Sequence, residues 1–361
     1  PSKIRKDIKK GIKKKDIEEL PNRKLAIHKS IQNLKTGEIL LVAGKGHEKT
    51  QDYGTKKIFF SDKKVILNLK KFKNKYLSKD IKLNIIKEKT NTQLPNNLVI
   101  KNASINSKTI KKNDIFFAIK GEKVDGNKFV SEAFKKKSSL AIVNDIDNKL
   151  PLSKQIKVKD TLDFLTTCSR YLRQNLDAKI ISITGSCGKT TLKEMLGSIL
   201  KQIFRTTISP KSFNNKYGVP LSLFNLKQND NFGVFEVGMD KKGEIDYLSN
   251  IIKPDLGIIT NISYAHSKNF KNINQIADAK AEIINNIKSN GTIVLNSDDN
   301  FFHYHKKIAT KKKLNVLSFG IEKKISFTKL IKIKKIVKNK YELKIKIDDS
   351  IYSFYSKNDN K

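Results

Sequence analysis

The sequence is short of cysteine, of long apolar runs and of acidic charge. Its two cysteines, Cys168 and Cys187, can form neither a disulfide framework nor a metal-binding pair of the usual spacing. No apolar stretch is long enough to cross a bilayer, and no signal peptide opens the chain. We therefore expect a protein of the reducing cytoplasm without membrane insertion. Because the first residue is Pro1, we expect the start to be a cut or processed end.

The 361 residues contain 74 Lys and Arg against 35 Asp and Glu, a formal net charge of +39. Such an excess usually indicates nucleic acid or an anionic membrane surface as the partner. Here, however, the lysines are spread along the chain, without an arginine-rich arm or interleaved aromatic residues for base stacking. The chain is also rich in Lys, Ile and Asn, whose codons are AT-rich, so genome composition can supply much of the lysine. We expect no nucleic-acid partner.

Residues 180–203 organise the chain. Three β-branched residues, Ile180, Ile181 and Ile183, predict a buried parallel strand, and apolar residues at helical spacing follow from Leu192. Between them lies Thr-Gly-Ser-Cys-Gly-Lys-Thr-Thr, whose glycines allow backbone N–H groups to close around phosphate at a helix N-terminus. The lysine can reach the β- and γ-phosphates, and the first threonine of the final pair can bind Mg²⁺. The predicted ATP-binding residues here are Gly185, Ser186, Cys187, Gly188, Lys189, Thr190 and Thr191.

The match to the general phosphate-loop pattern is incomplete, because position 183 holds Ile where that pattern has Gly. The alternative is a tight strand-to-helix turn with a chance Gly-Lys-Thr. The shortened form Thr-Gly-Ser-x-Gly-Lys-Thr-Thr resembles the nucleotide loop of the Mur ligase family, ATP-dependent enzymes of peptidoglycan precursor synthesis.

Polar residues after the loop helix support a ligase site. Asn214 and Asn215, followed by Gly-Val-Pro, closely match the MurF-type pattern, and their amides suit a polar sugar–peptide substrate. Glu236 ends an apolar strand, where a lone carboxylate is unfavourable unless it is paired or bound to metal. We predict an Mg²⁺ ligand; the alternative is a salt bridge.

Three further residues complete the predicted site. A single histidine is more often structural, but the family motif Thr-Asn-Ile-x-x-Ala-His implies that His266 contacts metal. Lys280 shares a helical face with isoleucines, so it either snorkels or has a lowered pKa. In Mur ligases the lysine of this Ala-Lys-x-x-Ile pattern is carbamylated, which would make it a metal ligand.

The resemblance also places adenine at Asn296, and we expect His303 and His305 to face solvent. The predicted catalytic residues are Lys189, His266 and Lys280.

Residues 94–173 alternate strand-like and helical stretches, which predicts a small α/β unit. Residues 105–108 and 114–121 are expected as strands. This unit resembles the uridine-nucleotide-binding domain of MurF-type ligases, which implies that Ser107, Lys108, Asp125 and Gly126 bind substrate. The sequence has Asn106 and Lys108 where the family usually has Asp and Arg, and lysine lacks the planar fork of arginine. The alternative for each residue is an ordinary structural turn.

Residues 41–62 resemble the C-terminal end of MurE-type ligases, which add the third peptide residue. The resemblance implies that Gly44 and Glu48 contact the incoming diamino acid. On spacing alone, a glycine-rich loop with solvated His and Glu is equally reasonable. The family's upstream Asp-Asn-Pro-Arg motif is not seen.

The sequence thus predicts an α/β fold: a P-loop central domain with a mostly parallel sheet, preceded by a small α/β uridine-nucleotide-binding domain and a partial Rossmann-like segment. The alternating apolar residues of 325–355 predict strands that close the central domain. The chain looks like part of a bifunctional fusion, without the MurF-type C-terminal domain expected next. The expected boundaries are 1–65 for the MurE-type segment, 66–93 for a linker, 94–173 for the substrate-binding domain and 174–361 for the ATP-binding domain.

The resemblance implies a reaction that uses ATP and Mg²⁺. A carboxylate of UDP-N-acetylmuramoyl-tripeptide attacks the γ-phosphate, and the amine of D-alanyl-D-alanine then displaces phosphate from the acyl phosphate. We expect a monomer. The alternatives are MurE-type addition within a fusion, another Mur-like ligase such as folylpolyglutamate synthase, a basic nucleic-acid-binding P-loop NTPase, or a fragment that binds without turnover.

Overall fold

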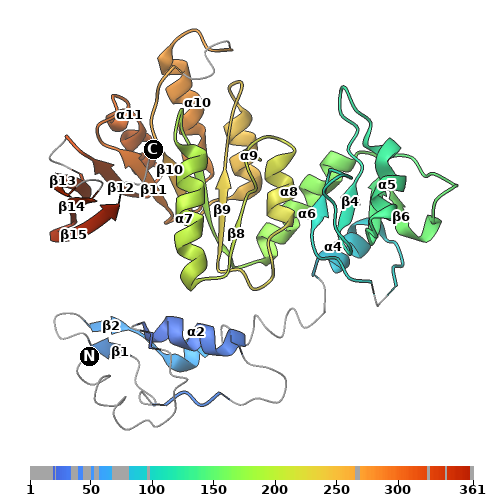
Figure 1. Cartoon of the computed structure of the whole chain (residues 1–361), viewed down its shortest axis with the longest axis horizontal. Helices are drawn as coiled ribbons and strands as arrows, with labels where there is room; N and C mark the ends of the chain where they lie inside the picture. The colour runs from blue at the N-terminus through green and yellow to red at the C-terminus, as the bar shows by residue number, and fades with distance from the viewer. Residues whose placement is uncertain are drawn as a thin grey trace. The chain divides into compact units, whose positions relative to one another are not determined.

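The computed structural model describes residues 19–20, 22–33, 40–43, 50–52, 57–66, 81–95, 98–264, 269–322, 326–337 and 340–357. The chain divides into two compact units, residues 1–79 and 80–361 (Figure 1). No helix among these described residues is long and apolar enough to span a bilayer.

The first unit contains helix α2 (Arg23–Asn33) and the antiparallel strands β1 (Thr50–Asp52) and β2 (Lys57–Phe59). Arg23 joins two parts of this unit. Its Nε lies 2.9 Å from Oδ1 of Asp62, and its Nη2 lies 2.7 Å from both Oδ2 of Asp62 and the carbonyl oxygen of Ala43. The ligand residues predicted in this region, Gly44 and Glu48, lie outside the described residues.

The second unit begins with helix α4 (Ile81–Thr90), which lies within the segment expected to be a linker. Its side chains Ile85 and Ile86 are buried, and it packs against α6 (Thr161–Asn175). A small parallel sheet follows, in the order β3-β4-β5-β6 among the described strands. Its elements are β3 (Ala103–Ser104), β4 (Ile115–Phe117), η1 (Gly126–Phe129), α5 (Val130–Lys135), β5 (Leu140–Val143), η2 (Leu152–Lys154) and β6 (Gln155–Lys157).

The strand predicted over residues 114–121 is confirmed in its first half by β4, whereas the strand predicted over 105–108 is wrong. That segment is a turn, because the side chain of Asn106 accepts a hydrogen bond from the backbone N–H of Lys108 at 2.8 Å. Asparagine favours such local turns over strand pairing.

The larger sheet has the order β15-β14-β13-β12-β11-β10-β7-β9-β8 in the part of the chain that the structure describes. Pairing is parallel from β8 through β13 and antiparallel among β13, β14 and β15. The strands are β7 (Lys179–Thr184), β8 (Thr206–Ile208), β9 (Phe232–Glu236), β10 (Leu256–Ile259), β11 (Thr292–Asn296), β12 (Asn315–Gly320), β13 (Thr328–Val337), β14 (Lys340–Ile347) and β15 (Ser350–Lys357). The expected mostly parallel α/β fold is confirmed.

Helices cover this sheet. One face carries α7 (Lys189–Ile203), whose residues Leu192, Leu196 and Leu200 pack on isoleucine and valine side chains of β7, β9 and β10. Gly197 allows close contact, since a Cβ there would lie 2.7 Å from Cγ1 of Ile208. The remaining helices are α8 (Gly218–Phe224), α9 (Glu244–Ile252), α10 (Ile273–Asn286) and α11 (Phe302–Lys311).

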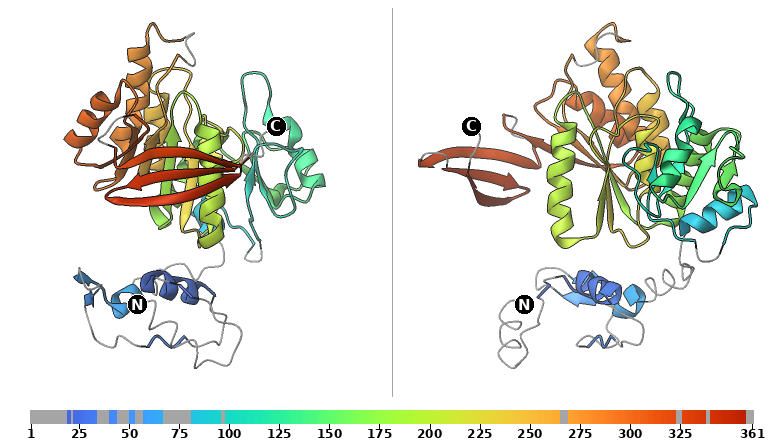
Figure 2. Two further views of the ribbon diagram at one scale, coloured as in Figure 1. Left: turned by 60° about the vertical axis from the view of Figure 1, so that its left-hand side comes forward. Right: turned by 45° about the vertical axis from the view of Figure 1, so that its right-hand side comes forward.

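The strands predicted over residues 325–355 are confirmed by β13, β14 and β15, which extend the sheet beyond its parallel part (Figure 2). Their register places apolar residues on one face, including Ile333, Leu343 and Phe354 side by side across the strands.

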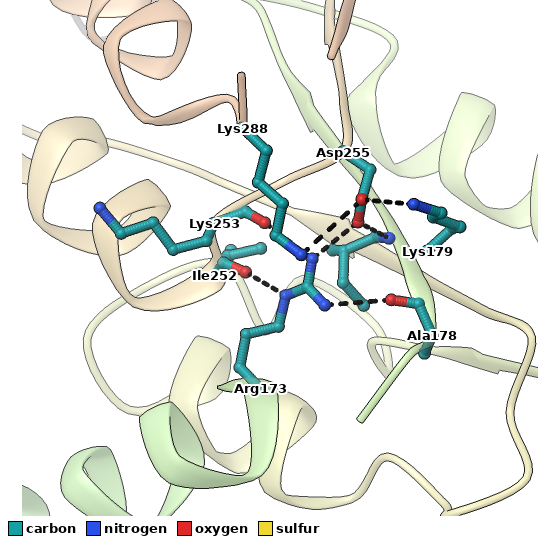
Figure 3. A network of polar contacts seen from close by, with 8 residues as sticks. Arg173, Ala178, Lys179, Ile252, Lys253, Asp255 and Lys288 are labelled. Carbon is teal, nitrogen blue, oxygen red and sulfur yellow. Dashed lines mark hydrogen bonds and ion pairs between the residues drawn. The ribbon is translucent and has the colours of Figure 1, made fainter. Parts of the chain in front are cut away.

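A buried ion pair joins α6 to the amino ends of β7 and β10 (Figure 3). Arg173, of which 4% is exposed, donates to the carbonyls of Ile252 (2.7 Å), Lys253 (2.8 Å) and Ala178 (3.1 Å). Its Nη2 also lies 2.6 Å from Oδ2 of Asp255. This Arg173 network connects the helix that leads out of the smaller sheet with the core of the larger one.

Candidate nucleotide and magnesium site

The loop between β7 and α7 contains two glycines in conformations that other residues rarely adopt. Gly185 has φ 143° and Gly188 has φ 80°. At Gly185 a Cβ would also collide with the side chain of Thr260, whereas the space beside Gly188 is open. The predicted order of strand, loop and helix is confirmed. Gly188 directly precedes α7, so the first N–H groups of that helix lie beside the loop without intrahelical acceptors.

The neighbouring loop residues are held by Asn261, which follows β10. The backbone N–H of Ser186 donates to its carbonyl, and that of Cys187 to its side-chain oxygen, both at 2.9 Å. Lys189 bends back over the loop, where its Nζ donates to the carbonyls of Gly185 (2.9 Å) and Ser186 (3.2 Å). The start of α7 and the Lys189 ammonium are therefore the parts of the loop best suited to meet an anion.

Glu236, at the carboxyl end of β9, is buried and lies at the centre of the site. Its Oε2 accepts a hydrogen bond from the Thr190 hydroxyl, and its Oε1 accepts one from the Asn214 amide, both at 2.7 Å. Two of the four residues predicted to bind Mg²⁺, Thr190 and Glu236, are thus in direct contact with each other. Glu236 also contacts Asn214, which was predicted to bind substrate, although the three residues are far apart in the sequence.

This donor set fits magnesium. In the described part of the chain, no three His, Cys, Asp or Glu side chains converge as a metal cluster. Magnesium, however, is usually bound through one or two carboxylates together with phosphate oxygens and water. The Glu236 carboxylate and the Thr190 hydroxyl are oxygen ligands of that kind. His266, the other predicted protein ligand besides Lys280, lies outside the described residues.

Lys280 is buried on α10, with 2% of its surface exposed. It has no hydrogen-bond or ion-pair partner among the described residues. Burial, and then the nearby ammonium of Lys189, lower its pKa to about 7. Lys189 and Cys187 are among the charged groups that affect this pKa, which places Lys280 within electrostatic range of the loop. The predicted apolar face is confirmed: Ile276, Ile283, Ile284 and Ile287 are all buried.

Asn296, at the end of β11, lines a small hollow beside this cluster. Asn261 lines the same hollow, so the residue that holds the loop amides also borders the predicted adenine position. The other lining residues are Ile259, Leu295, Asp299, Phe302 and His305.

His303 is exposed as expected, but the prediction that His305 faces solvent is wrong. His305 is buried, its Nε2 lies 3.1 Å from the Ala277 carbonyl, and burial lowers its pKa. It shares the inner face of α11 with Phe302 and Ala309. That spacing is the sequence signal that could have identified it.

Asn215 has a different role from Asn214. Its side-chain oxygen accepts hydrogen bonds from the N–H groups of Tyr217 (3.1 Å) and Gly218 (3.0 Å), at the start of α8. The contacts of Asn215 therefore hold the beginning of a helix, whereas Asn214 contacts the Glu236 carboxylate.

The substrate residues predicted in the smaller sheet also have local contacts. The hydroxyl of Ser107, which is buried, donates to Glu132 at 2.7 Å, and Lys108 is exposed. Asp125 caps η1 by accepting the N–H of Asn127 at 2.9 Å. A Cβ at Gly126 would lie 2.6 Å from the backbone of residues 118–119. Turn geometry alone thus accounts for Asp125 and Gly126, and their substrate role stays a prediction.

Two family models match this chain. The Mur ligase middle domain matches residues 183–357, and the catalytic domain of the Mur ligase family matches residues 99–170. The chain belongs to the Mur ligase family. Both matches lie outside residues 1–65, so the MurE-type segment stays a prediction.

One relative is the UDP-N-acetylmuramoyl-tripeptide--D-alanyl-D-alanine ligase of Buchnera aphidicola subsp. Acyrthosiphon pisum. It is 39% identical to this chain over 227 residues, which cover 63% of this chain and 49% of that protein. The ligase of the same name from Rickettsia prowazekii is 35% identical over 240 residues, 65% of this chain and 52% of that protein. The chain of this Mur ligase therefore spans about half the length of these relatives.

Solved MurF structures share the fold. A crystal structure of MurF from Acinetobacter baumannii is 30% identical with a TM-score of 0.65, covering 75% of this chain and 59% of that one. MurF from Thermotoga maritima, solved in complex with ADP, is 27% identical with a TM-score of 0.61, covering 72% of this chain and 58% of that one.

Proposed function

We propose that this chain forms the substrate- and ATP-binding part of a MurF-type ligase. The ligase would use ATP and Mg²⁺ to join D-alanyl-D-alanine to UDP-N-acetylmuramoyl-tripeptide. The observation that carries the proposal is the contact of Glu236 with both Thr190 and Asn214, beside the lysines of the loop and of α10. The names of the relatives supply the substrates. A cytoplasmic location and a monomeric state belong to the same proposal.

The loop lysine and the start of α7 would stabilise the transferred phosphoryl group. Lys189 now donates to two loop carbonyls, and a bound triphosphate would offer it stronger, charged acceptors. The helix N-terminus adds partial positive charge at the same place. Negative charge that develops during attack by the substrate carboxylate would therefore meet donors that are already in position.

Thr190 and Glu236 would hold the magnesium ion. When bound, Mg²⁺ would reduce the repulsion between the attacking carboxylate and the phosphate. Asn214 fixes one oxygen of Glu236, so the carboxylate keeps a defined orientation toward the loop.

Lys280 would act after carbamylation. With a pKa of about 7, a large fraction of its amine is neutral at physiological pH. The neutral nitrogen can attack CO₂, form an N–C bond and lose one proton, which gives a carbamate anion. This change would replace a buried cation by an anionic oxygen ligand facing the loop. His266 is proposed as a further ligand from its sequence motif.

The nucleotide base would lie near Asn296, an assignment that follows the family resemblance. Asn261, which holds the loop amides, lines the same small hollow as Asn296. The uridine nucleotide is assigned to the smaller sheet, through Ser107, Lys108, Asp125 and Gly126. This assignment follows the family resemblance of the segment that contains them.

Calorimetric titration of the 361-residue chain tests the proposal. We expect saturable binding of MgATP and of UDP-N-acetylmuramoyl-tripeptide, and weaker binding of single- or double-stranded nucleic acid at physiological salt. The variant Lys189→Ala should lose MgATP affinity while it keeps the affinity for the uridine substrate. Absence of binding to the uridine substrate, or tighter binding to nucleic acid, would contradict the assignment.

A further inference from the structure

A second lysine of α7, Lys193, is buried completely, with 0% of its side chain exposed. It lies one helical turn after Thr190. Lysine is almost never fully buried unless its ammonium is paired. Here Nζ donates to the backbone carbonyl of Lys211 and lies 3.2 Å from Oε1 of Glu194.

The acceptor belongs to the loop between β8 and α8. Lys211 has φ 46°, a left-handed conformation that is unfavourable for residues other than glycine. The bond from Lys193 therefore holds the loop at a point where its backbone is strained. A further hydrogen bond continues this loop, from the N–H of Phe213 to the carbonyl of Pro210 at 3.1 Å.

Three residues beyond Lys211, the same loop supplies Asn214. Its side chain donates to Oε1 of Glu236, and its carbonyl accepts the N–H of Gly238 at 2.8 Å. Space for this contact is limited, since a Cβ at Gly238 would lie 2.8 Å from the Asn214 side chain. A shift of the loop would therefore move the amide that orients the carboxylate.

Helix α7 consequently fixes both oxygens of Glu236. Thr190 contacts Oε2 directly, whereas Lys193 acts on Oε1 through the loop and Asn214. We propose that Lys193 is a positioning residue, which holds the loop of residues 209–215 so that Asn214 and Glu236 are set for magnesium-bound nucleotide. The inference rests on the proposed nucleotide site and adds a residue to it.

The test is the magnesium dependence of nucleotide binding by the 361-residue chain. ADP affinity is measured with Mg²⁺ and with EDTA, for wild type, Lys193→Met and the matched control Lys201→Met. Lys201 is exposed in the last turn of the same helix. Lys193→Met should reduce the gain in affinity from Mg²⁺ about tenfold, the range seen when a group behind a metal ligand is removed. Affinity in EDTA, and both values for Lys201→Met, should change little.

Two further variants sharpen the result. Lys211→Gly keeps the carbonyl and relieves the backbone, so it should retain the full magnesium effect. Lys193→Gln is a milder change in case Lys193→Met does not fold, and it should show a smaller loss in the same direction. A normal magnesium effect in whichever of these Lys193 variants folds would overturn the positioning role. Absence of any magnesium effect in wild type would instead contradict the proposed function.

Discussion

Two buried cations, Arg173 and Lys280, lie near opposite ends of the parallel strands of the larger sheet, and their surroundings differ. At the amino edge, Arg173 has three backbone carbonyls and the Asp255 carboxylate as acceptors (Figure 3). Close to the carboxyl edge, Lys280 is just as buried but has no hydrogen-bond or ion-pair partner among the described residues. A guanidinium with five donors can satisfy several acceptors at once, which suits it to a structural network.

The difference in hydrogen-bond partners distinguishes a cation that stabilises the fold from one that is suited to a functional site. Removing one member of a satisfied buried pair leaves its partners without hydrogen bonds, so the Arg173 network contributes to folding. A buried cation without a partner opposes folding, and such groups are concentrated at functional sites. We therefore expect opposite effects on stability when the two cations are replaced by methionine.

Arg173→Met should have the largest effect. It removes the guanidinium from three carbonyls and from Asp255, which keeps only the partly exposed Lys179 and Lys288 and the N–H of Ile180. We expect the free energy of unfolding to fall by about 3–5 kcal/mol. Urea denaturation measures the change. Lys179→Met is the matched control, because that lysine contacts the same carboxylate at 3.1 Å but is mostly exposed. It should lower stability by less than about 1 kcal/mol. Equal effects of the two variants would contradict the comparison.

Lys280→Met should instead stabilise the chain, by up to about 4 kcal/mol at pH 7 in CO₂-free buffer. The pKa of Lys280 falls from 10.5 to about 7 on folding, so between these values the unfolded chain binds more protons. The loss of folding free energy caused by Lys280 is complete below pH 7, decreases as the pH rises and disappears above about pH 10.5. Unfolding curves of wild type and variant should therefore converge with increasing pH. A difference that stays constant across this range would show that Lys280 is not a suppressed cation.

Lys189→Ala tests the cation next to Lys280. Loss of one electrostatic donor at a reacting phosphate removes about 3 kcal/mol of transition-state stabilisation, or roughly 100-fold in rate. The measurement is ATP turnover in the complete ligase, with Lys201→Ala as the exposed control on the same helix. Unchanged turnover in Lys189→Ala would exclude the loop lysine from the reaction.

Alkylation of cysteine should give the smallest effect, and the buried Cys168 serves as the control for the exposed Cys187. Cys187 is exposed on the loop, whereas Cys168 is buried, and burial raises its pKa to about 12. N-ethylmaleimide should therefore modify Cys187 alone and weaken MgATP binding at least about tenfold by obstructing the phosphate position. Bound MgATP should slow the modification, and Cys187→Ser should be insensitive. Undiminished ATP affinity after complete alkylation would place the nucleotide elsewhere.

The sequence indicated the parts of the site that rest on local periodicity. A β-branched strand, a glycine-rich loop and an amphipathic helix predict β7 and α7. The isoleucine spacing places Lys280 on an apolar helical face and leaves snorkelling or burial open; the structure shows that it is buried. The placement of Asn214, Glu236 and Thr190 in one cluster follows from parallel strands that end at the same edge.

Other features could not be predicted from the sequence. Some depend on partners that are distant along the chain, and one depends on a side chain that competes with strand pairing for the backbone hydrogen bonds of a turn. The carbonyls that surround Arg173 come partly from residues about 80 positions away, and backbone acceptors leave no mark in a sequence. The turn at Asn106 forms because its side chain satisfies the backbone locally. The burial of His305 depends on a backbone carbonyl of α10, and the burial of Lys193 depends on a carbonyl in another loop.

In the proposed site, Thr190 and Glu236 hold the metal of a nucleotide whose phosphates lie at the start of α7. The most direct measurement is the anomalous scattering of Mn²⁺ in crystals of this chain grown with Mn²⁺ and a non-hydrolysable ATP analogue. We expect a single strong manganese peak next to the Thr190 hydroxyl, the Glu236 carboxylate and the β- and γ-phosphates. Phosphates at the loop with manganese bound away from both side chains, or nucleotide bound elsewhere on the sheet, would contradict it.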